Sequence, residues 1–520
     1  MNRKPIHRNE WADLIFMSAI LFGTFMRFNP TLLAGFPISQ GGMFSVMVDD
    51  LRANHYLLPI YTTYNHLQIP FAYPPLGFYI GGIVADLFSI DSVQVVRWLP
   101  AFFASLSVPA FYLLALRLLK NKYHASVATL FFALMPRAFS WFITGSGLTR
   151  SPGQFFLLLT LAVIVRLCQE DRRSDIFWAG IFAALTVMSH PEAAVHMIAS
   201  VIFFWIMLGH SRAAFIQLVG VGVITLIVSA PWWVSVLHYH GIAPLLSAAQ
   251  TGQKTSAVLN LVFFDFAEEP YATLITVLAL IGLSQRLIRR DFFLPLWLAL
   301  PFLVEGRSAA LPAAIPLAML AAIGLVDVVV IALSPDTGRK LEKPGQIPIV
   351  ELSIIVYVLL YLLFSTYQFG LQLSGSSVPI SDREAMDWVH TNTPAGSRFL
   401  VLTGTNSISC DMVLEWFPAL TDRQSLYTVQ GTEWTKGANF RNYVQSTYAV
   451  QKCLSSSDVS CLDSTVDPSE YDFVYISKMP RVNCTAVDLP NSFSHFIEGM
   501  RMEKGFGVVY EIEDLIIFSK

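Results

Sequence analysis

Charged side chains are scarce in this sequence. They make up 14% of its 520 residues, whereas soluble domains usually carry about 25%. Hydrophobic residues account for 54% of the chain, so the composition excludes a disordered chain and argues against a soluble globular protein. The formal net charge of −3 gives no sign of a nucleic-acid partner, and we expect none. In such a chain the positions of the few charges carry the information.

Cysteine is also rare, with five residues in the chain. Cys168 lies in an apolar segment, while Cys410, Cys453, Cys461 and Cys484 all follow residue 400. Four cysteines confined to one polar region predict disulfides on an oxidising side of the membrane, with the Cys453–Cys461 pair as the first choice. Four free thiols are the alternative, because sequence alone does not show pairing. No CxxC or mixed Cys/His spacing typical of zinc is present.

Long apolar runs dominate the first two thirds of the chain. A helix that crosses a bilayer needs about 17–25 mainly apolar residues. The first run follows MNRKPIHRNEW without a small-residue cleavage pattern, so we expect a retained anchor. A run at 75–90 is shorter and is interrupted by Gly81-Gly82. Eleven other segments are predicted to span, at about 11–28, 95–118, 123–143, 150–168, 174–189, 192–209, 212–236, 269–287, 291–304, 309–333 and 349–373.

The basic residues indicate an orientation for these segments. The positive-inside rule places Lys and Arg clusters on the cytoplasmic face. With all clusters on that face, successive spans can cross the membrane in alternating directions only if 75–90 does not span. We therefore predict that 75–90 lies along the outer interface or re-enters the membrane. The N-terminus is then cytoplasmic and the C-terminus lies outside the cell membrane. If 75–90 does span, another segment does not, and 291–304 is the weakest. The clusters are Arg3/Lys4/Arg8, Arg117/Lys120/Lys122, Arg172/Arg173, Arg212, Arg286/Arg289/Arg290 and Arg339/Lys340/Lys343.

The composition changes at about residue 376. The stretch 381–404 predicts a helix, a turn and a buried strand, and 471–478 and 507–520 predict further strands. We therefore expect a polytopic α-helical membrane domain at 1–375, with a long first outer loop at 29–94. An extracytoplasmic α/β domain follows at 376–520 and has an ordinary domain size.

The polar motifs of the membrane part all fall on the predicted outer face, opposite the basic clusters. This separation favours a functional cavity that opens outward. Glu269, at the end of a long outer loop, is one candidate for substrate binding. The outer stretches are 37–76, 145–151, 189–192, 238–268 and 305–308.

Asp49 and Asp50 are the carboxylates of the first outer loop. One of them would serve as a general base, because a carboxylate with a raised pKa can take a proton from an attacking hydroxyl. The alternative is a solvated helix end with Arg52 as a partner. Both interpretations stay open for Asp50, whereas the structural one is favoured for Asp49. Neighbouring residues on a helix point about 100° apart, so the two do not share a face.

Four further outer-face residues are candidates for binding a substrate phosphate. His190 and Glu192 bracket a proline and would polarise a phosphate or bind a metal, or Glu192 would simply favour a helix N-terminus. Arg150 and Arg307 would hold a phosphate with paired hydrogen bonds, or would extend to the lipid headgroups. Tyr73 is either a substrate contact or a residue of the interfacial aromatic belt. Together they suit a lipid-linked, phosphate-bearing, sugar-like substrate.

Several motifs resemble those of membrane-embedded C-type (GT-C) glycosyltransferases. The order and topology of the motifs carry the resemblance, which covers nearly the whole chain. It extends to protein O-mannosyltransferase-like proteins and, more distantly, to oligosaccharyltransferase catalytic subunits, and it is nearest to a family-39-like bacterial and archaeal subgroup. The motifs are AYPPLGFYI (72–80), RWLPAFFASLSVPAFYLLALRLL (97–119), GSGLTRS (145–151), SHPE (189–192), PWW (231–233) and EWFPALTDRQS…TVQGTEW (415–434).

The resemblance implies transfer of a sugar from a polyprenyl phosphate to an acceptor glycan, lipid or protein on the outer face. It also implies an acidic residue near the start of the first outer loop, where this chain has Gln40. An amide cannot act as a general base. Either Asp50 or Glu192 substitutes, or the chain is a catalytically silent relative that serves as a structural or assembly subunit. We expect no cofactor, since the ligand spacing does not support a divalent metal. The absence of repeats argues against a transporter.

Overall fold

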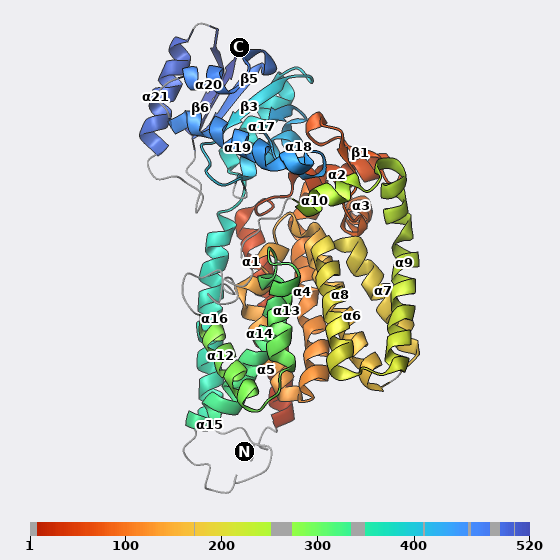
Figure 1. The fold of residues 1–520 in the computed structure, drawn as a ribbon. Coiled ribbons are helices and arrows are strands. Elements are labelled where there is room, and N and C mark those ends of the chain that lie inside the picture. Colours follow the sequence, from red (N-terminus) through yellow and green to blue (C-terminus); the bar gives the residue numbers. More distant parts are fainter. Residues whose placement is uncertain are drawn as a thin grey trace.

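The computed structural model describes residues 8–170, 172–250, 273–333, 349–408, 411–455, 459–478, 489–503 and 505–520. A long helical bundle carries a smaller α/β domain at one end (Figure 1). The first helix, α1, begins at the end of the bundle opposite the C-terminal domain (Figure 1). The chain is therefore mostly helical with a sheet-containing C-terminal region, as the composition and the apolar runs predict.

Eleven stretches of the bundle coincide with the eleven expected spans. Side chains cap several of these helices: Asp91 accepts a hydrogen bond from the Gln94 N–H at 2.6 Å, and Asn121 caps the next helix in the same way. The helices are α1 (Arg8–Ala34), α4 (Ser92–Leu119), α5 (Lys122–Leu134), α6 (Gly147–Glu170), α7 (Ser174–Ser189), α8 (Pro191–Leu208), α9 (Arg212–His240), α12 (Leu274–Ile288), α13 (Phe293–Val304), α14 (Ala310–Gly324), which continues through a π turn (Leu325–Val329) into α15 (Val330–Leu333), and α16 (Ile349–Ser374).

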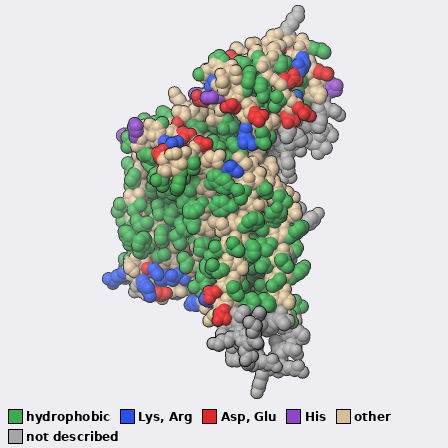
Figure 2. All heavy atoms as spheres, turned by 180° about the vertical axis from the view of Figure 1, so that it is seen from behind, with side chains coloured by type: hydrophobic (Ala, Val, Ile, Leu, Met, Phe, Trp, Pro, Cys, Tyr) green, Lys and Arg blue, Asp and Glu red, His purple; other side chains and the backbone are tan. Residues whose placement is uncertain are grey.

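Seven of the described helices are long and apolar enough to cross a membrane. The helices α7, α12 and α13 are apolar but shorter. A band of apolar side chains surrounds the bundle, with Lys and Arg gathered at the edge away from the C-terminal domain (Figure 2). These features make the chain a multi-pass membrane protein. Which end faces the cytoplasm stays a prediction.

Two segments differ in shape from simple spans. The expected span at 123–143 is broken after Leu134, where the chain bends by 85°. Met135 precedes Pro136 and has extended backbone angles, because a residue before proline disfavours the helical region. The 75–90 run forms α3 (Leu76–Phe88), which has 13 residues and lies beside α2 (Gly42–Ala53) near the C-terminal domain (Figure 1). At about 1.5 Å per residue this helix is too short to cross a bilayer.

The C-terminal domain is built on a five-stranded sheet in the order β4-β3-β5-β7-β6. Strand β3 is parallel to β4 and β5, whereas β7 is antiparallel to β5 and β6. The expected strand at 507–520 is thus a hairpin of two strands. Their bounds are β3 (Arg398–Leu402), β4 (Gln424–Leu426), β5 (Phe473–Ser477), β6 (Gly507–Ile512) and β7 (Leu515–Ser519).

Helices cover both faces of this sheet. Phe399 and Val401 point toward the face covered by α17 (Ile380–Asn392) and α18 (Met412–Thr421), in one core with residues of the first outer loop. Leu400 and Leu402 alternate with them and pack toward α21 (Leu489–Met502) on the other face. The helix α19 (Phe440–Lys452) adds Val450 to this second core. One face of the sheet is therefore continuous with the membrane domain.

Cys453 and Cys461 form a disulfide with a Cα–Cα distance of 5.6 Å, as predicted. Cys168 is a free thiol in α6. Cys410 and Cys484 lie outside the described residues, so their predicted pairing stays open. The disulfide confirms the first choice of pair and is consistent with an oxidising environment.

Glu415 in α18 fastens the C-terminal domain to the first outer loop. Its carboxylate accepts hydrogen bonds from the backbone N–H groups of Gly41, Gly42 and Met43 at 3.0–3.1 Å. These N–H groups stand at the start of α2, where a helix has no partners of its own for them. The adjacent Trp416 donates its indole N–H to the Ser39 carbonyl at 2.9 Å. We call this arrangement the Glu415 clasp.

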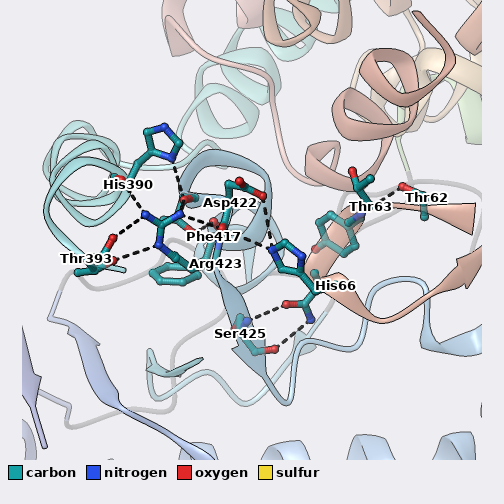
Figure 3. Close-up of polar contacts among 12 residues, drawn as sticks. Thr62, Thr63, His66, His390, Thr393, Phe417, Asp422, Arg423 and Ser425 are labelled. Atoms are coloured by element: carbon teal, nitrogen blue, oxygen red, sulfur yellow. Dashed lines mark hydrogen bonds and ion pairs between the residues drawn. The ribbon is translucent and has the colours of Figure 1, made fainter. Parts of the chain in front are cut away.

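A second set of contacts holds the middle of the loop. Asn65 exchanges two hydrogen bonds with the Ser425 backbone, at 3.0 and 2.7 Å. His66 lies 3.4 Å from the Asp422 carboxylate (Figure 3). Arg423, which is 5% exposed, donates to the carbonyls of His390 and Thr393 and so fixes the turn on which His66 docks (Figure 3). The loop and the C-terminal domain are therefore packed together, and we call the C-terminal domain the cap of the bundle.

Candidate functional site

A cavity with a volume of about 40 Å³ lies among the helices of the bundle. Three helices supply its walls: α6, α8 and α14. Charged and polar groups lie at one end and aliphatic groups at the other. The lining residues are Phe142, Arg150, Gln154, Leu157, His190, Glu192, Ala193, His196, Ser308, Leu311, Pro312 and Ile315. The break after α5 matters here, because the short turns that follow it bring Phe142 into the wall.

Arg150 lies in the first turn of α6. One guanidinium nitrogen donates to the Ser146 hydroxyl at 2.8 Å, and the guanidinium lies 5.6 Å from the centre of the Trp141 ring. Arginine has five N–H donors, so several remain for a ligand in the cavity. An arginine steadied in this way presents a fixed positive charge to the cavity.

Arg307 lies on the loop between α13 and α14 and forms an ion pair with Glu192. Its Nε donates to a Glu192 carboxylate oxygen at 3.0 Å, and its Nη2 contacts the same oxygen. Glu305 holds the loop by accepting from the Arg307 N–H, the Ser308 N–H and the Ser308 hydroxyl at 2.7–3.0 Å. Burial acts to raise the pKa of Glu305, but hydrogen bonds with His196 and Ser308 outweigh it and lower the pKa to about 2.

His190 and Tyr73 connect the cavity to the cap. His190 is 6% exposed, and this burial lowers its pKa to about 3, so the ring is neutral at physiological pH. The Tyr73 ring lies 6.1 Å from the His190 ring and 5.8 Å from the Trp434 ring of the C-terminal domain. Burial also raises the pKa of Tyr73, which keeps its hydroxyl protonated. Two aromatic contacts thus lead from the cavity wall to the C-terminal domain.

The structure brings Arg150, His190 and Glu192 together in one cavity, with Arg307 and Tyr73 in contact with them. Sequence reasoning selected these five residues from four separate loops. Glu269 lies outside the described residues. In the described part of the chain, no group of three or more His, Cys, Asp or Glu residues is arranged to hold a metal ion.

The remaining candidates lie outside the cavity lining. Asp50 accepts hydrogen bonds from the Thr62 hydroxyl at 2.6 Å and from the Thr63 N–H and hydroxyl at 3.0 and 2.7 Å. Asp49 accepts from Arg52 at 3.0 Å and from the Ser92 hydroxyl at 2.5 Å. Asp49 therefore has Arg52 as a partner, as in the structural interpretation favoured for it, whereas Asp50 is held by two threonines and not by Arg52. A role of Asp50 as a general base stays a prediction.

Gln40 lies in the turn before α2, where the loop meets Gly145. A Cβ atom at Gly145 would lie 2.3 Å from the Gln40 carbonyl oxygen, so only glycine permits this approach. The Gly145 N–H donates to the Ile38 carbonyl at 2.8 Å. Gln40 therefore sits at a tight crossing of the first and second outer loops.

Sequence reasoning missed two carboxylates of the C-terminal domain, Glu415 and Glu433. Burial raises the pKa of each to about 7. Both occur in the 415–434 stretch that carried part of the family resemblance. Nothing in the local pattern marks them. The Glu415 carboxylate binds N–H groups 372–374 residues earlier in the chain, and Glu433 is one polar residue within a polar domain.

Comparisons with known proteins support one fold. A family model described as dolichyl-phosphate-mannose-protein mannosyltransferase matches residues 72–234. No curated protein matches the chain. Among solved structures, the archaeal oligosaccharyltransferase AglB from Archaeoglobus fulgidus is 14% identical with a TM-score of 0.54, over 90% of this chain and 69% of that one.

Two further structures are similar along nearly the whole chain. ArnT from Cupriavidus metallidurans is 13% identical with a TM-score of 0.53, over 98% of both chains. The arabinofuranosyltransferase AftD from Mycobacteria is 14% identical with a TM-score of 0.57, over 99% of this chain and 40% of that one. All are membrane glycosyltransferases of the C type, so the resemblance seen in the sequence is confirmed for the fold.

Proposed function

We propose that this GT-C-fold protein transfers a sugar from a polyprenyl-phosphate donor to an acceptor at the outer face of the cell membrane. The solved structures of AglB and ArnT contain a dolichol-phosphate and undecaprenyl phosphate, respectively. In this proposal the C-terminal domain lies outside and the basic edge of the bundle faces the cytoplasm. Membrane lipid surrounds the apolar band.

The observation that carries this proposal is the pair of arginines at one aliphatic cavity. Arg150 lines the cavity from α6, and Arg307 contacts Glu192, another lining residue. Arginine binds phosphate oxygens with strong, paired hydrogen bonds. Leu157 and Ile315 supply apolar lining nearby. Arginines beside an apolar wall suit a polyprenyl phosphate, with its phosphate bound by the arginines and its prenyl chain extending into the lipid.

The ion pair between Arg307 and Glu192 gives Glu192 a role in the proposed function. A bound phosphate competes with Glu192 for the Arg307 guanidinium, and the released carboxylate can accept a hydrogen bond from a sugar hydroxyl. The neutral His190 and the protonated Tyr73 each offer one further polar group for orientation. These assignments require no metal ion.

The test measures donor binding and turnover on the full-length protein in nanodiscs. Undecaprenyl phosphate and a panel of undecaprenyl-phosphate pentoses and hexoses would be added to the wild type, Arg150→Ala and Arg307→Ala. We expect the wild type to bind the lipid phosphate and both variants to bind at least about tenfold more weakly, since a hydrogen bond to a charged group contributes about 1.5–3 kcal/mol. Binding that is equal in all three proteins would contradict the assignment.

A second candidate function is a catalytically silent subunit of a membrane complex. Gln40 favours it, because the family's acidic residue is absent from this position, and Asp49 and Asp50 are both engaged in the loop. Turnover separates the two functions. Lipid-phosphate binding without release of sugar from any donor would support the silent subunit, whereas sugar release that Asp50→Asn abolishes would make Asp50 the base.

A further inference from the structure

We propose that Glu433, in the C-terminal domain, is the carboxylate that accepts the proton of the acceptor hydroxyl. This inference rests on the proposed glycosyltransferase function. It assigns the base to the cap instead of the first outer loop, where the sequence has Gln40. The position of a short turn, the charges around it and the engagement of the other carboxylates lead to the same residue.

Glu433 lies in a single 3-10 turn, Thr432–Trp434, that docks on the membrane domain. Gly431 precedes it with φ of +83°, and a Cβ there would lie 2.5 Å from the Ile69 side chain, so only glycine allows this close approach. The Ser247 hydroxyl donates to the Glu433 carbonyl at 2.6 Å. Two segments distant in sequence, around Ile69 and Ser247, therefore pack against this turn.

The same turn reaches the cavity through aromatic rings. Trp434 is 6% exposed, and its ring lies 5.8 Å from that of Tyr73. Tyr73 in turn lies beside His190, which lines the cavity. Two ring contacts, through Tyr73 and His190, therefore connect the turn to the cavity wall.

Four titratable groups from the packed elements face Glu433. Arg307 and Tyr73 lie on the cavity side, and Glu415 and Tyr64 lie on the side of the Glu415 clasp. Burial raises the pKa of Glu433 to about 7, with backbone hydrogen bonds and Arg307 acting in the opposite direction and Glu415 adding to the rise. A base with a pKa near the operating pH transfers protons well.

The other carboxylates near the cavity are engaged elsewhere. Glu192 pairs with Arg307, and Glu305 accepts hydrogen bonds from its own loop. Asp50 accepts three hydrogen bonds, and Glu415 accepts three backbone N–H groups. Among the described residues, no side chain forms an ion pair with Glu433. Glu433 as a whole residue is partly buried.

The proposed step balances as a nucleophilic displacement. The acceptor oxygen forms a bond to the anomeric carbon of the sugar while its proton passes to the Glu433 carboxylate. The bond between the anomeric carbon and the phosphate oxygen breaks, and its electron pair leaves with the polyprenyl phosphate beside Arg150 and Arg307. Glu433 returns the proton to water after the product leaves.

The experiment compares wild type, Glu433→Gln and Glu433→Asp with the control Glu470→Gln, which changes an exposed carboxylate of the same domain. Full-length protein in nanodiscs receives radiolabelled undecaprenyl-phosphate pentoses and hexoses, with water, octyl glycosides or serine peptides as acceptors. Release of labelled sugar is measured from pH 5.5 to 8.5. Donor binding is measured in parallel with undecaprenyl phosphate.

We expect Glu433→Gln to lower kcat by about 100-fold or more, the usual contribution of a general base, with undecaprenyl phosphate binding unchanged. Wild-type kcat should rise with pH around a midpoint near 7, because the base must be ionised. This rise should be absent in Glu433→Gln, shifted in Glu433→Asp and unchanged in Glu470→Gln.

Two results would overturn the inference alone. One is a Glu433→Gln variant with wild-type kcat. The other is a variant whose kcat falls equally at every pH and keeps the wild-type midpoint, which is the mark of a purely structural role. A wild type that releases no sugar from any donor would overturn the inference together with the proposed function.

Discussion

Replacing Glu415 by alanine should loosen the first outer loop from the cap. The change removes the carboxylate that accepts hydrogen bonds from the buried N–H groups of Gly41, Gly42 and Met43. The distances between donor and acceptor atoms are 3.0–3.1 Å. Above its pKa of about 7 the Glu415 carboxylate is charged, and hydrogen bonds to a charged group contribute about 1.5–3 kcal/mol each. Water will enter part of the emptied site, so we expect the free energy of local opening to fall by about 3–5 kcal/mol.

Hydrogen exchange measures this opening at the amides concerned. A loss of about 3 kcal/mol corresponds to an increase of more than about 100-fold in the exchange rate, because each tenfold step equals about 1.36 kcal/mol. The peptide that covers 36–50 contains the three amides and would be followed by mass spectrometry in nanodiscs. Glu415→Gln keeps one acceptor oxygen and should give a smaller increase.

The matched control is Glu470→Ala, which removes an exposed carboxylate of the same domain. Its exchange in the 36–50 peptide should equal that of the wild type. Suppose instead that the exchange rates of the three amides in Glu415→Ala stay within about threefold of the wild-type rates. The amides would then be protected from exchange without the carboxylate. The Glu415 clasp would then contribute little to docking, and the reasoning would be refuted.

Three further outcomes follow from the structure. Arg150→Ala should weaken binding of undecaprenyl phosphate by about 10-fold or more, measured by titration in nanodiscs; equal binding would remove this residue from the phosphate site. Reduction of the Cys453–Cys461 disulfide, or a double serine variant, should destabilise the C-terminal domain by about 2–3 kcal/mol, given the short loop that it closes, as measured by thermal unfolding. Gly145→Ala should sharply lower the yield of folded protein, whereas Gly396→Ala, where a Cβ meets no atom within 4 Å, should not.

The helices could be predicted because their signal is local. An apolar run of sufficient length is a property of consecutive residues, and all eleven expected spans correspond to helices. The break after Leu134 was not predicted, although Pro136 offers the signal, because the apolar composition continues through it. The disulfide was also predictable, since its cysteines are separated by only eight positions.

Some of the residues around the cavity could be predicted from the sequence, and others could not. Polar residues at helix ends are conspicuous in an apolar chain, and this contrast identified Arg150, His190 and Glu192. The surroundings of Glu415 and Glu433 are formed by residues that are far away in sequence. A carboxylate in a polar domain also has polar neighbours in the sequence, so its local pattern does not distinguish it. The loop aspartates attracted attention for the opposite reason, since a local charge pair is visible whether or not it faces a ligand.

The sheet order has a consequence for biosynthesis. Strand β7 is the last of the five in sequence, yet it lies between β5 and β6. Until residues 515–519 have been synthesised, β5 keeps an unpaired edge that can pair with a strand of another chain. The bundle helices precede β7 by more than a hundred residues. A shortened chain that lacks β7 would consequently combine a complete helical bundle with an exposed sheet edge, which favours aggregation.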